Sequence, residues 1–321
     1  MRVHPRLIPA VFCCTAACGG ASDPSPPPIV WGPGLGPGAS LEGRRPFPDD
    51  NPWNTAVDQD PVDLNSDALI ARIGANAALH PDFGANWNGG PFGIPYVVID
   101  STIPLVPVTF TYDDESDPGP YPIPEGAPVE GGNRSKGDRH VLVVDRDAWM
   151  LYELFAAYPK GGGWKAGSGA VFDLGSNALR PDGWTSADAA GLPIFPGLVR
   201  YDEVVEQGEI RHALRFTVSQ TRRGYVAPAR HFASNDTDPG LPPMGMRVRL
   251  KASFDTTGFP PQAQVILAAL KTYGMILADN GSNWYVSGAP DARWDDDQLN
   301  SLKALRGGDF EVVEMGPVTT D

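Results

Sequence analysis

The sequence predicts a mainly β protein, with a β-sandwich, jelly-roll or barrel-like fold and a few short helices; an α+β fold is the main alternative. Three observations support this prediction. The 37 glycines and 34 prolines among 321 residues favour many turns and few long helices. Ten short segments alternate apolar and polar residues, as half-buried strands do. Only three stretches space their apolar residues as helices do.

The ten expected strands are short and are separated by turn residues, a pattern typical of sandwiches and barrels. They cover residues 96–100, 108–112, 140–145, 150–156, 171–174, 211–218, 246–254, 275–279, 284–287 and 310–315.

The three expected helices are recognised by their ends as well as by their spacing. The first begins near Asn65. The second covers 261–273 and ends at Gly274, because glycine adopts the left-handed conformation of a helix C-terminus at little cost. The third begins at Asp295, which is expected to form a capping box with Gln298.

The N-terminal segment has the pattern of an export signal, in which Arg2 and Arg6 precede a short apolar run. Small residues before Cys18 and two glycines after it resemble a bacterial lipobox, whose cysteine thiol is lipidated. The resemblance implies a membrane-anchored lipoprotein, exported to the outer membrane or the cell surface.

The expected organisation has three parts. Residues 1–17 form the lipoprotein signal peptide, and residues 18–46 form a tether because they are rich in proline and glycine. Residues 47–321 form a single globular domain.

Cysteine content and charge exclude several classes of function. All three cysteines lie in the first 18 residues, so the domain has no disulfide, thiol nucleophile or cysteine-ligated metal. The formal net charge of −14 excludes nucleic acid as a partner, because its phosphates repel so acidic a chain.

Several longer sequence runs resemble a group of uncharacterised bacterial secreted and surface proteins. The resemblance implies export and a single domain, and it brings no activity, cofactor or catalytic residue with it. The runs are residues 48–54, 80–84, 184–194, 196–200, 210–216 and 278–281.

Basic residues gather in one part of the domain, residues 200–251, where nine of them accompany six acids. If the strands of this stretch were neighbours, their arginines would form a cationic strip that binds carboxylates or sulfates. A solvated sheet face neutralised by acids from elsewhere is the alternative. Loop aromatic rings can add stacking on sugars. The predicted ligand-binding residues are Arg215, Arg247, Arg249, Trp184 and Asp188.

Three residues within seven positions have the side chains that a polysaccharide lyase requires. Tyr225 or His231 would abstract the proton beside a uronate carboxylate, and Arg230 would neutralise that carboxylate. A purely structural role for them is the alternative. His212 is expected to be a hydrogen-bonded core histidine. A glycoside hydrolase would use two carboxyl groups instead. The candidates for that pair are Asp188, Asp202, Glu203 and Asp279.

The predicted function is therefore that of a cell-surface lipoprotein that binds a polysaccharide, an anionic one if the basic strip forms. Whether the chain is an enzyme stays open; if it is, a polysaccharide lyase or a glycoside hydrolase is expected. The alternative is a non-catalytic structural or adhesion module of the cell envelope. No cofactor and no metal site is predicted, although residues 113–117 and 236–238 have the oxygen density for calcium.

Overall fold

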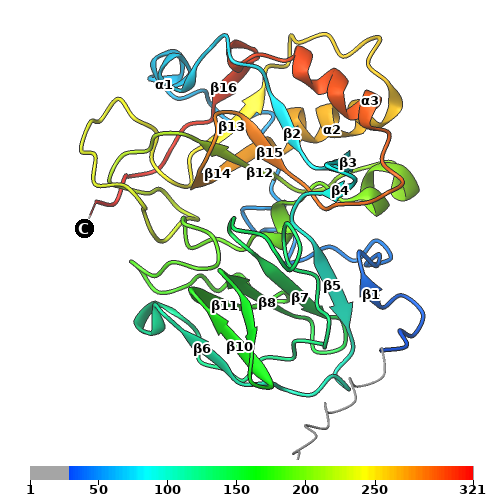
Figure 1. Ribbon diagram of the computed structural model, residues 1–321. Coiled ribbons are helices and arrows are strands. Elements are labelled where there is room, and N and C mark those ends of the chain that lie inside the picture. Colours follow the sequence, from blue (N-terminus) through cyan, green and yellow to red (C-terminus); the bar gives the residue numbers. More distant parts are fainter. Residues whose placement is uncertain (1–28, 321) are drawn as a thin grey trace, which may run out of the picture. The chain divides into compact units, whose positions relative to one another are not determined.

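A computed structural model describes residues 29–320 of the chain (Figure 1). The fold is built mainly of β-strands. The strands form several sheets, including a curled half-barrel, and the helices are few and short, so the predicted fold class is confirmed. Trp31–Asp321 form one compact unit, and the other unit, Met1–Val30, is described only at residues 29 and 30. The predicted signal peptide and Cys18 lie outside the described residues.

A six-stranded mixed sheet carries the larger of two hydrophobic cores. Its spatial order is β16-β13-β14-β12-β15-β2, and the central pair β12 and β14 is parallel. Apolar side chains of the helices join the same core, in which α1 contacts β16 and α2 contacts β13. The elements are α1 (Ser66–Ile73), β2 (His80–Asp82), β12 (Leu214–Val218), β13 (Arg247–Leu250), α2 (Pro261–Thr272), β14 (Met275–Asn280), β15 (Tyr285–Ser287), α3 (Asp296–Asn300) and β16 (Phe310–Val312).

A five-stranded sheet and a three-stranded sheet enclose the smaller core in the lower half of Figure 1. The five-stranded sheet has the order β1-β5-β7-β8-β11, and the three-stranded sheet has the order β6-β10-β9. Their strands are β1 (Gly36–Pro37), β5 (Tyr96–Ile99), β6 (Val108–Phe110), β7 (Val141–Asp145), β8 (Met150–Phe155), β9 (Tyr158–Lys160), β10 (Gly163–Ala166) and β11 (Ser168–Asp173). The short helical turns are η1 (Asp113–Glu115), η2 (Phe195–Gly197), the π-helix η3 (Asp202–Gln207), η4 (Ser301–Ala304) and η5 (Gly307–Asp309).

The three predicted helices are present, and the residues expected to end α2 and to cap α3 do so. Gly274 follows α2 with φ 65°, and a Cβ at this position would lie 2.2 Å from the Val248 carbonyl oxygen. The Asp295 carboxylate caps α3 by accepting from the backbone N–H groups of Asp297 and Gln298. The capping box is only half formed, because the Gln298 amide donates to Asp295 instead of accepting from its backbone.

All ten predicted strand segments contain a strand, whereas the strands that the alternation missed are short and contain proline or glycine. One of them, β1, alters the predicted organisation. Gly36 pairs with Val98 of β5, and Leu41 is buried in the larger core. Residues 31–46 therefore pack on the domain instead of forming the predicted tether. The Pro/Gly-rich composition of residues 31–46 did not predict this packing, because the pairing of β1 with β5 uses backbone groups and leaves no side-chain pattern.

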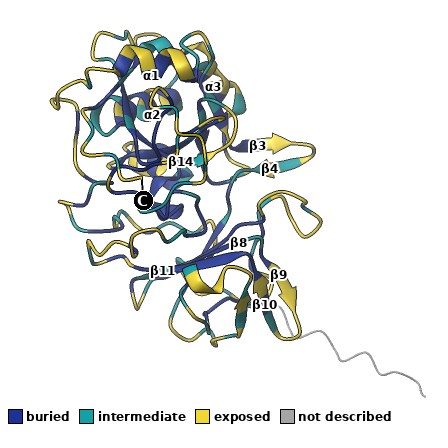
Figure 2. Cartoon of the chain, turned by 90° about the vertical axis from the view of Figure 1, so that its left-hand side faces the viewer, coloured by how far each residue is buried: buried dark blue, intermediate teal, exposed yellow. Residues whose placement is uncertain are grey.

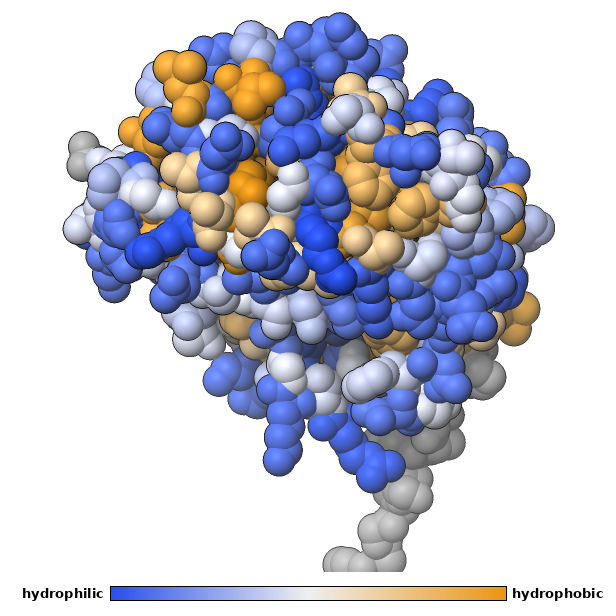
Figure 3. Space-filling view, turned by 90° about the horizontal axis from the view of Figure 1, so that it is seen from above, coloured by the Kyte–Doolittle hydropathy of each residue, from blue (hydrophilic) through white to orange (hydrophobic). Residues whose placement is uncertain are grey.

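Two features of the outer surface are a mostly hydrophilic face over the helices and a projecting hairpin. Seen from above, the helical face is mostly hydrophilic, with apolar side chains in separate patches (Figure 3). A two-stranded hairpin of β3 (Gly84–Trp87) and β4 (Gly90–Phe92) projects from the body (Figure 2). Within residues 29–320, no helix has both the length and the apolar composition to cross a membrane.

Candidate functional site

A cleft of about 1460 Å³ opens beside the six-stranded sheet. Its lining includes the strands β12, β14 and β15, the β3–β4 hairpin, the segment 126–140 that leads into β7, and the segment 289–293 that follows β15. This volume exceeds the roughly 300–1,000 Å³ of ordinary small-molecule pockets, so the cleft has room for a chain of several sugar units.

The cleft-facing side of the sheet is polar because alternate residues of a strand point to the same face. Thr217 pairs with Tyr285 on one side and with Asp279 on the other. A bulge in β14 leaves Ala278 unpaired and shifts the register, which turns Asp279 to the face that carries Thr217. Ser287 pairs with Asp82 of β2, and both line the cleft.

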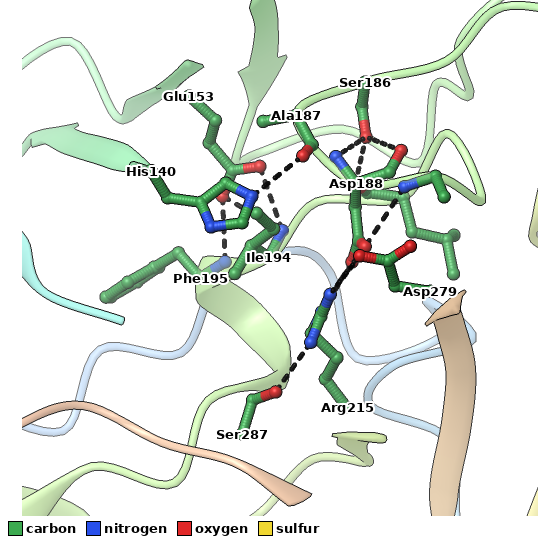
Figure 4. A network of polar contacts seen from close by, with 12 residues as sticks. His140, Glu153, Ser186, Ala187, Asp188, Ile194, Phe195, Arg215, Asp279 and Ser287 are labelled. Atoms are coloured by element: carbon green, nitrogen blue, oxygen red, sulfur yellow. Dashed lines mark hydrogen bonds and ion pairs between the residues drawn. The ribbon is translucent and has the colours of Figure 1, made fainter. Parts of the chain in front are cut away.

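Arg215 is the centre of the polar contacts at the base of the cleft (Figure 4). Its Nε and Nη2 atoms donate to the two carboxylate oxygens of Asp188, both at 2.7 Å. Nη1 donates to Ser287 Oγ at 2.7 Å, and Nη2 also lies 3.4 Å from Asp279 Oδ2. Burial acts to lower the pKa of Arg215, but the Asp188 carboxylate outweighs it and raises that pKa above its usual value.

The turn that carries Asp188 is fixed by the Ser186 side chain, by a hydrogen bond to β14 and by Gly191. Ser186 Oγ accepts from the Asp188 N–H at 2.9 Å. Ala190 N–H donates to the carbonyl of Ala278, the residue that the bulge leaves unpaired. Gly191 has φ 69°, and a Cβ there would lie 2.5 Å from a backbone oxygen, so a glycine is required. The bulge and the turn therefore hold both carboxylates against Arg215.

Burial raises the pKa of two carboxyl groups of the cleft lining, Asp82 and Asp279. Burial and the neighbouring Asp188 carboxylate raise the pKa of Asp279 to about 6, against the opposing effects of Arg215, His140 and the Asn280 N–H. A carboxyl group with such a pKa can carry a proton near neutral pH and donate it.

His140 comes directly before β7 of the five-stranded sheet and also lines the cleft. Its Nδ1 lies 2.7 Å from Glu130 Oε2 and its Nε2 lies 3.1 Å from the Ala187 carbonyl oxygen. Burial acts to lower the pKa of His140, but the Glu130 carboxylate and its hydrogen bond raise it to about 9. The ring is therefore held between two acceptors.

Glu153 of β8 lies behind the same turn and is completely buried. Its carboxylate accepts from the backbone N–H groups of Ile194 and Phe195 at 2.8–3.0 Å. Burial raises the pKa of Glu153 to about 7, although these two N–H groups act to lower it. Glu153 thereby fastens the 186–195 segment, which carries Asp188 and the Ala187 carbonyl, to the five-stranded sheet.

Among the predicted ligand-binding residues, the structure brings Arg215 and Asp188 together and places the others elsewhere. Arg247 donates to backbone carbonyl oxygens, those of Tyr273, Pro52 and Thr55. Arg249 donates to the Glu311 carboxylate and to the carbonyl oxygens of Val57 and Asp60. β14 separates β13 from β12, and Ile276 lies between Arg215 and Arg247 in the register, so the arginines do not form the predicted strip. Trp184 lies against Arg180 and does not line the cleft.

The three predicted lyase residues gather away from the cleft lining. Tyr225 donates its hydroxyl to Asp182 at 2.8 Å, and Arg230 forms an ion pair with the same carboxylate at 2.6 Å. His231 Nδ1 lies 2.7 Å from the Ala189 carbonyl oxygen. His212 is buried and hydrogen-bonded to Glu203, as expected of a core histidine.

Sequence reasoning did not single out Asp82, Glu130, His140 or Glu153. For Glu153 a signal existed, since a lone acid inside the apolar strand 150–155 has to be buried among donors or turned outward. Asp82 and Glu130 lie in segments rich in proline and glycine, where alternation gives no information.

Comparisons with protein-family models, with curated proteins and with solved structures found no match to this chain. The resemblance to bacterial secreted and surface proteins therefore stays a prediction, and the function is inferred from the cleft itself.

Proposed function

We propose that the cleft binds a polysaccharide and hydrolyses it, with Asp279 as the proton donor to the leaving sugar. The observation that carries this proposal is a large cleft that combines a polar base with an exposed tryptophan and a carboxyl group of pKa about 6. Polar groups at the base can hydrogen-bond sugar hydroxyls, and an aromatic face supplies contact area at low entropic cost.

The charge of the cleft favours a neutral glycan over an anionic one. The basic side chains of the lining are all engaged with acids: Arg215 with Asp188, Arg293 with Asp291 and Glu206, and His140 with Glu130. Several carboxyl groups line the same space and would repel a polyanion. They are Asp82, Glu130, Asp138, Asp279 and Asp291.

The near-neutral pKa of Asp279 also favours hydrolysis over lyase chemistry. A glycosidase needs an acid that is protonated at the working pH, and burial beside Asp188 gives Asp279 that property. The residues with lyase-type side chains, Tyr225, Arg230 and His231, lie outside the cleft lining and contact Asp182 and the backbone.

The test is incubation of the purified full-length chain with neutral and with uronic-acid polysaccharides, following gel retardation, new reducing ends and the absorbance of unsaturated uronate. New reducing ends from a neutral glycan without that absorbance support the proposal. Growing absorbance identifies a lyase instead, and retardation alone identifies a binding module. The absence of all three signals favours a structural or adhesion module.

Trp87 is the residue on which binding affinity is expected to depend. It lines the cleft in the β3–β4 hairpin and is 68% exposed, and the Asp296 carboxylate holds the hairpin through the N–H groups of Ala85 and Asn86. We expect Trp87→Ala to weaken glycan binding by about 1 kcal/mol, roughly fivefold in Kd, because the stacking face is lost.

Calorimetric titration with the retained glycan measures this effect. Trp87→Phe should keep most of the affinity, since a smaller ring still stacks. Tyr112→Ala is the matched control, because Tyr112 is also exposed but lies outside the cleft lining. Equal affinity in Trp87→Ala and the wild type would remove the hairpin from the binding site.

We also propose that the chain is exported and anchored through lipid on Cys18, at the outer membrane or the cell surface. Support comes from the lipobox-like residues alone. Cys18→Ser should release the protein from the membrane fraction and remove the added lipid mass; a membrane-bound, unchanged variant would contradict the anchor.

A further inference from the structure

We propose that Glu130, Asp138 and His140 form a binding site for a divalent transition-metal ion on the wall of the cleft. The site lies where the segment 126–140 enters β7, and all three residues line the cleft.

The three side chains already converge. One ligand atom from each, a carboxylate oxygen of Glu130 and of Asp138 and a ring nitrogen of His140, lie within 4.8 Å of one another. Bonds of about 2.0–2.2 Å place two ligands of one ion at most about 4.4 Å apart. Asp138 is exposed, so its side chain can move toward the other two ligands and close that difference.

The contacts of the histidine ring are those of a metal ligand. Nε2 lies 3.1 Å from the Ala187 carbonyl oxygen, which can only accept, so Nε2 carries the hydrogen. The other nitrogen, Nδ1, faces the Glu130 carboxylate at 2.7 Å, and a bound ion would take the place of the proton that these two groups share. Metal-binding histidines typically donate their second N–H to such a carbonyl, which fixes the orientation of the ring. The Ala187 carbonyl belongs to the 186–195 segment, which Glu153 holds through the N–H groups of Ile194 and Phe195.

The donor set decides the class of ion. An imidazole with two carboxylates suits Zn²⁺ or Mn²⁺ better than Ca²⁺, which prefers six to eight oxygen atoms. Three protein ligands leave coordination positions open toward the cleft, as in catalytic metal sites. The surplus of carboxyl groups in the cleft adds attraction for a cation.

The test is calorimetric titration of Zn²⁺ into the full-length chain after chelator treatment, with Mn²⁺ and Ca²⁺ titrated in parallel and without any polysaccharide. We expect one Zn²⁺ per chain. His140→Gln and Asp138→Asn should each weaken binding by at least roughly 10- to 100-fold, because the loss of an outer-shell partner alone has an effect of that size. Asp114→Asn is the matched control, an exposed aspartate of the acidic 113–117 segment, and should leave Zn²⁺ affinity unchanged.

Three results would overturn the site: no saturable Zn²⁺ binding, unchanged affinity in both ligand variants, or Ca²⁺ bound in preference to Zn²⁺. Asp138→Asn alters only an exposed side chain, so it remains informative even if His140→Gln does not fold. Since no glycan is present, failure of metal binding leaves the proposed polysaccharide activity standing, and failure of that activity leaves the metal site standing.

Discussion

Replacing Asp279 with asparagine is expected to lower kcat for glycan hydrolysis by about 10²–10⁴-fold while glycan affinity changes little, because general acid catalysis contributes an effect of that size. The amide keeps the shape of the carboxyl group and can still accept the Asn280 N–H, which lies 2.7 Å from Oδ1 in the wild type. It has no proton to give to the leaving sugar oxygen.

The same assignment predicts the pH dependence of the wild type. The working form of Asp279 is protonated, and its pKa is about 6 under the combined effects of burial, Asp188, Arg215 and His140. The hydrolysis rate should therefore fall as the pH rises through about 6, approaching tenfold per pH unit well above it. Reducing-end kinetics between pH 4.5 and 8 would measure this limb.

A matched control is available at the end of another strand. Asp100 follows β5 and also accepts a neighbouring backbone N–H, but it is outside the cleft lining. Asp100→Asn should therefore keep the wild-type rate and pH profile. If Asp279→Asn kept full activity, or if the wild-type rate stayed level across pH 6, Asp279 would not be the proton donor.

Ten of the sixteen strands and the three α-helices that the described residues form were predictable because each depends on residues close in sequence. Alternation within 275–279 located β14, and Gly274 marked the end of α2. The bulge at Ala278 was not predictable, because it appears only when β14 is paired with β12. That single extra residue decides that Asp279 faces the cleft.

The basic strip shows the same difference between local and long-range information. Arg215 and Arg247 were each placed correctly on a strand, yet the strip required the two strands to be neighbours, and β14 lies between them. Arg215 pairs instead with Asp188, 27 residues earlier in the chain. Spacing carries no information about such a contact, because it depends on which loop covers which sheet.

Breaking the ion pair between Asp188 and Arg215 should have the largest effect on stability. The Arg215 side chain is 4% exposed and that of Asp188 is fully buried. Asp188→Ala would leave a buried guanidinium with Ser287 Oγ and the more distant Asp279 as its remaining partners. Removing one partner of a buried pair costs about 3–5 kcal/mol of unfolding free energy. Urea or guanidinium unfolding would measure it.

A second, exposed ion pair of the same chain shows how much of this loss of unfolding free energy is due to burial. Arg72 and Asp238 are 2.8 Å apart, but both side chains are about half exposed, so Arg72→Ala should cost no more than about 1 kcal/mol. In a double-mutant cycle, Asp188→Ala with Arg215→Ala should cost clearly less than the sum of the two single variants, because no buried charge then remains unpaired. If Asp188→Ala proved as mild as Arg72→Ala, water or another group would have to reach Arg215, and the cleft would be wetter at its base than the burial of this arginine implies.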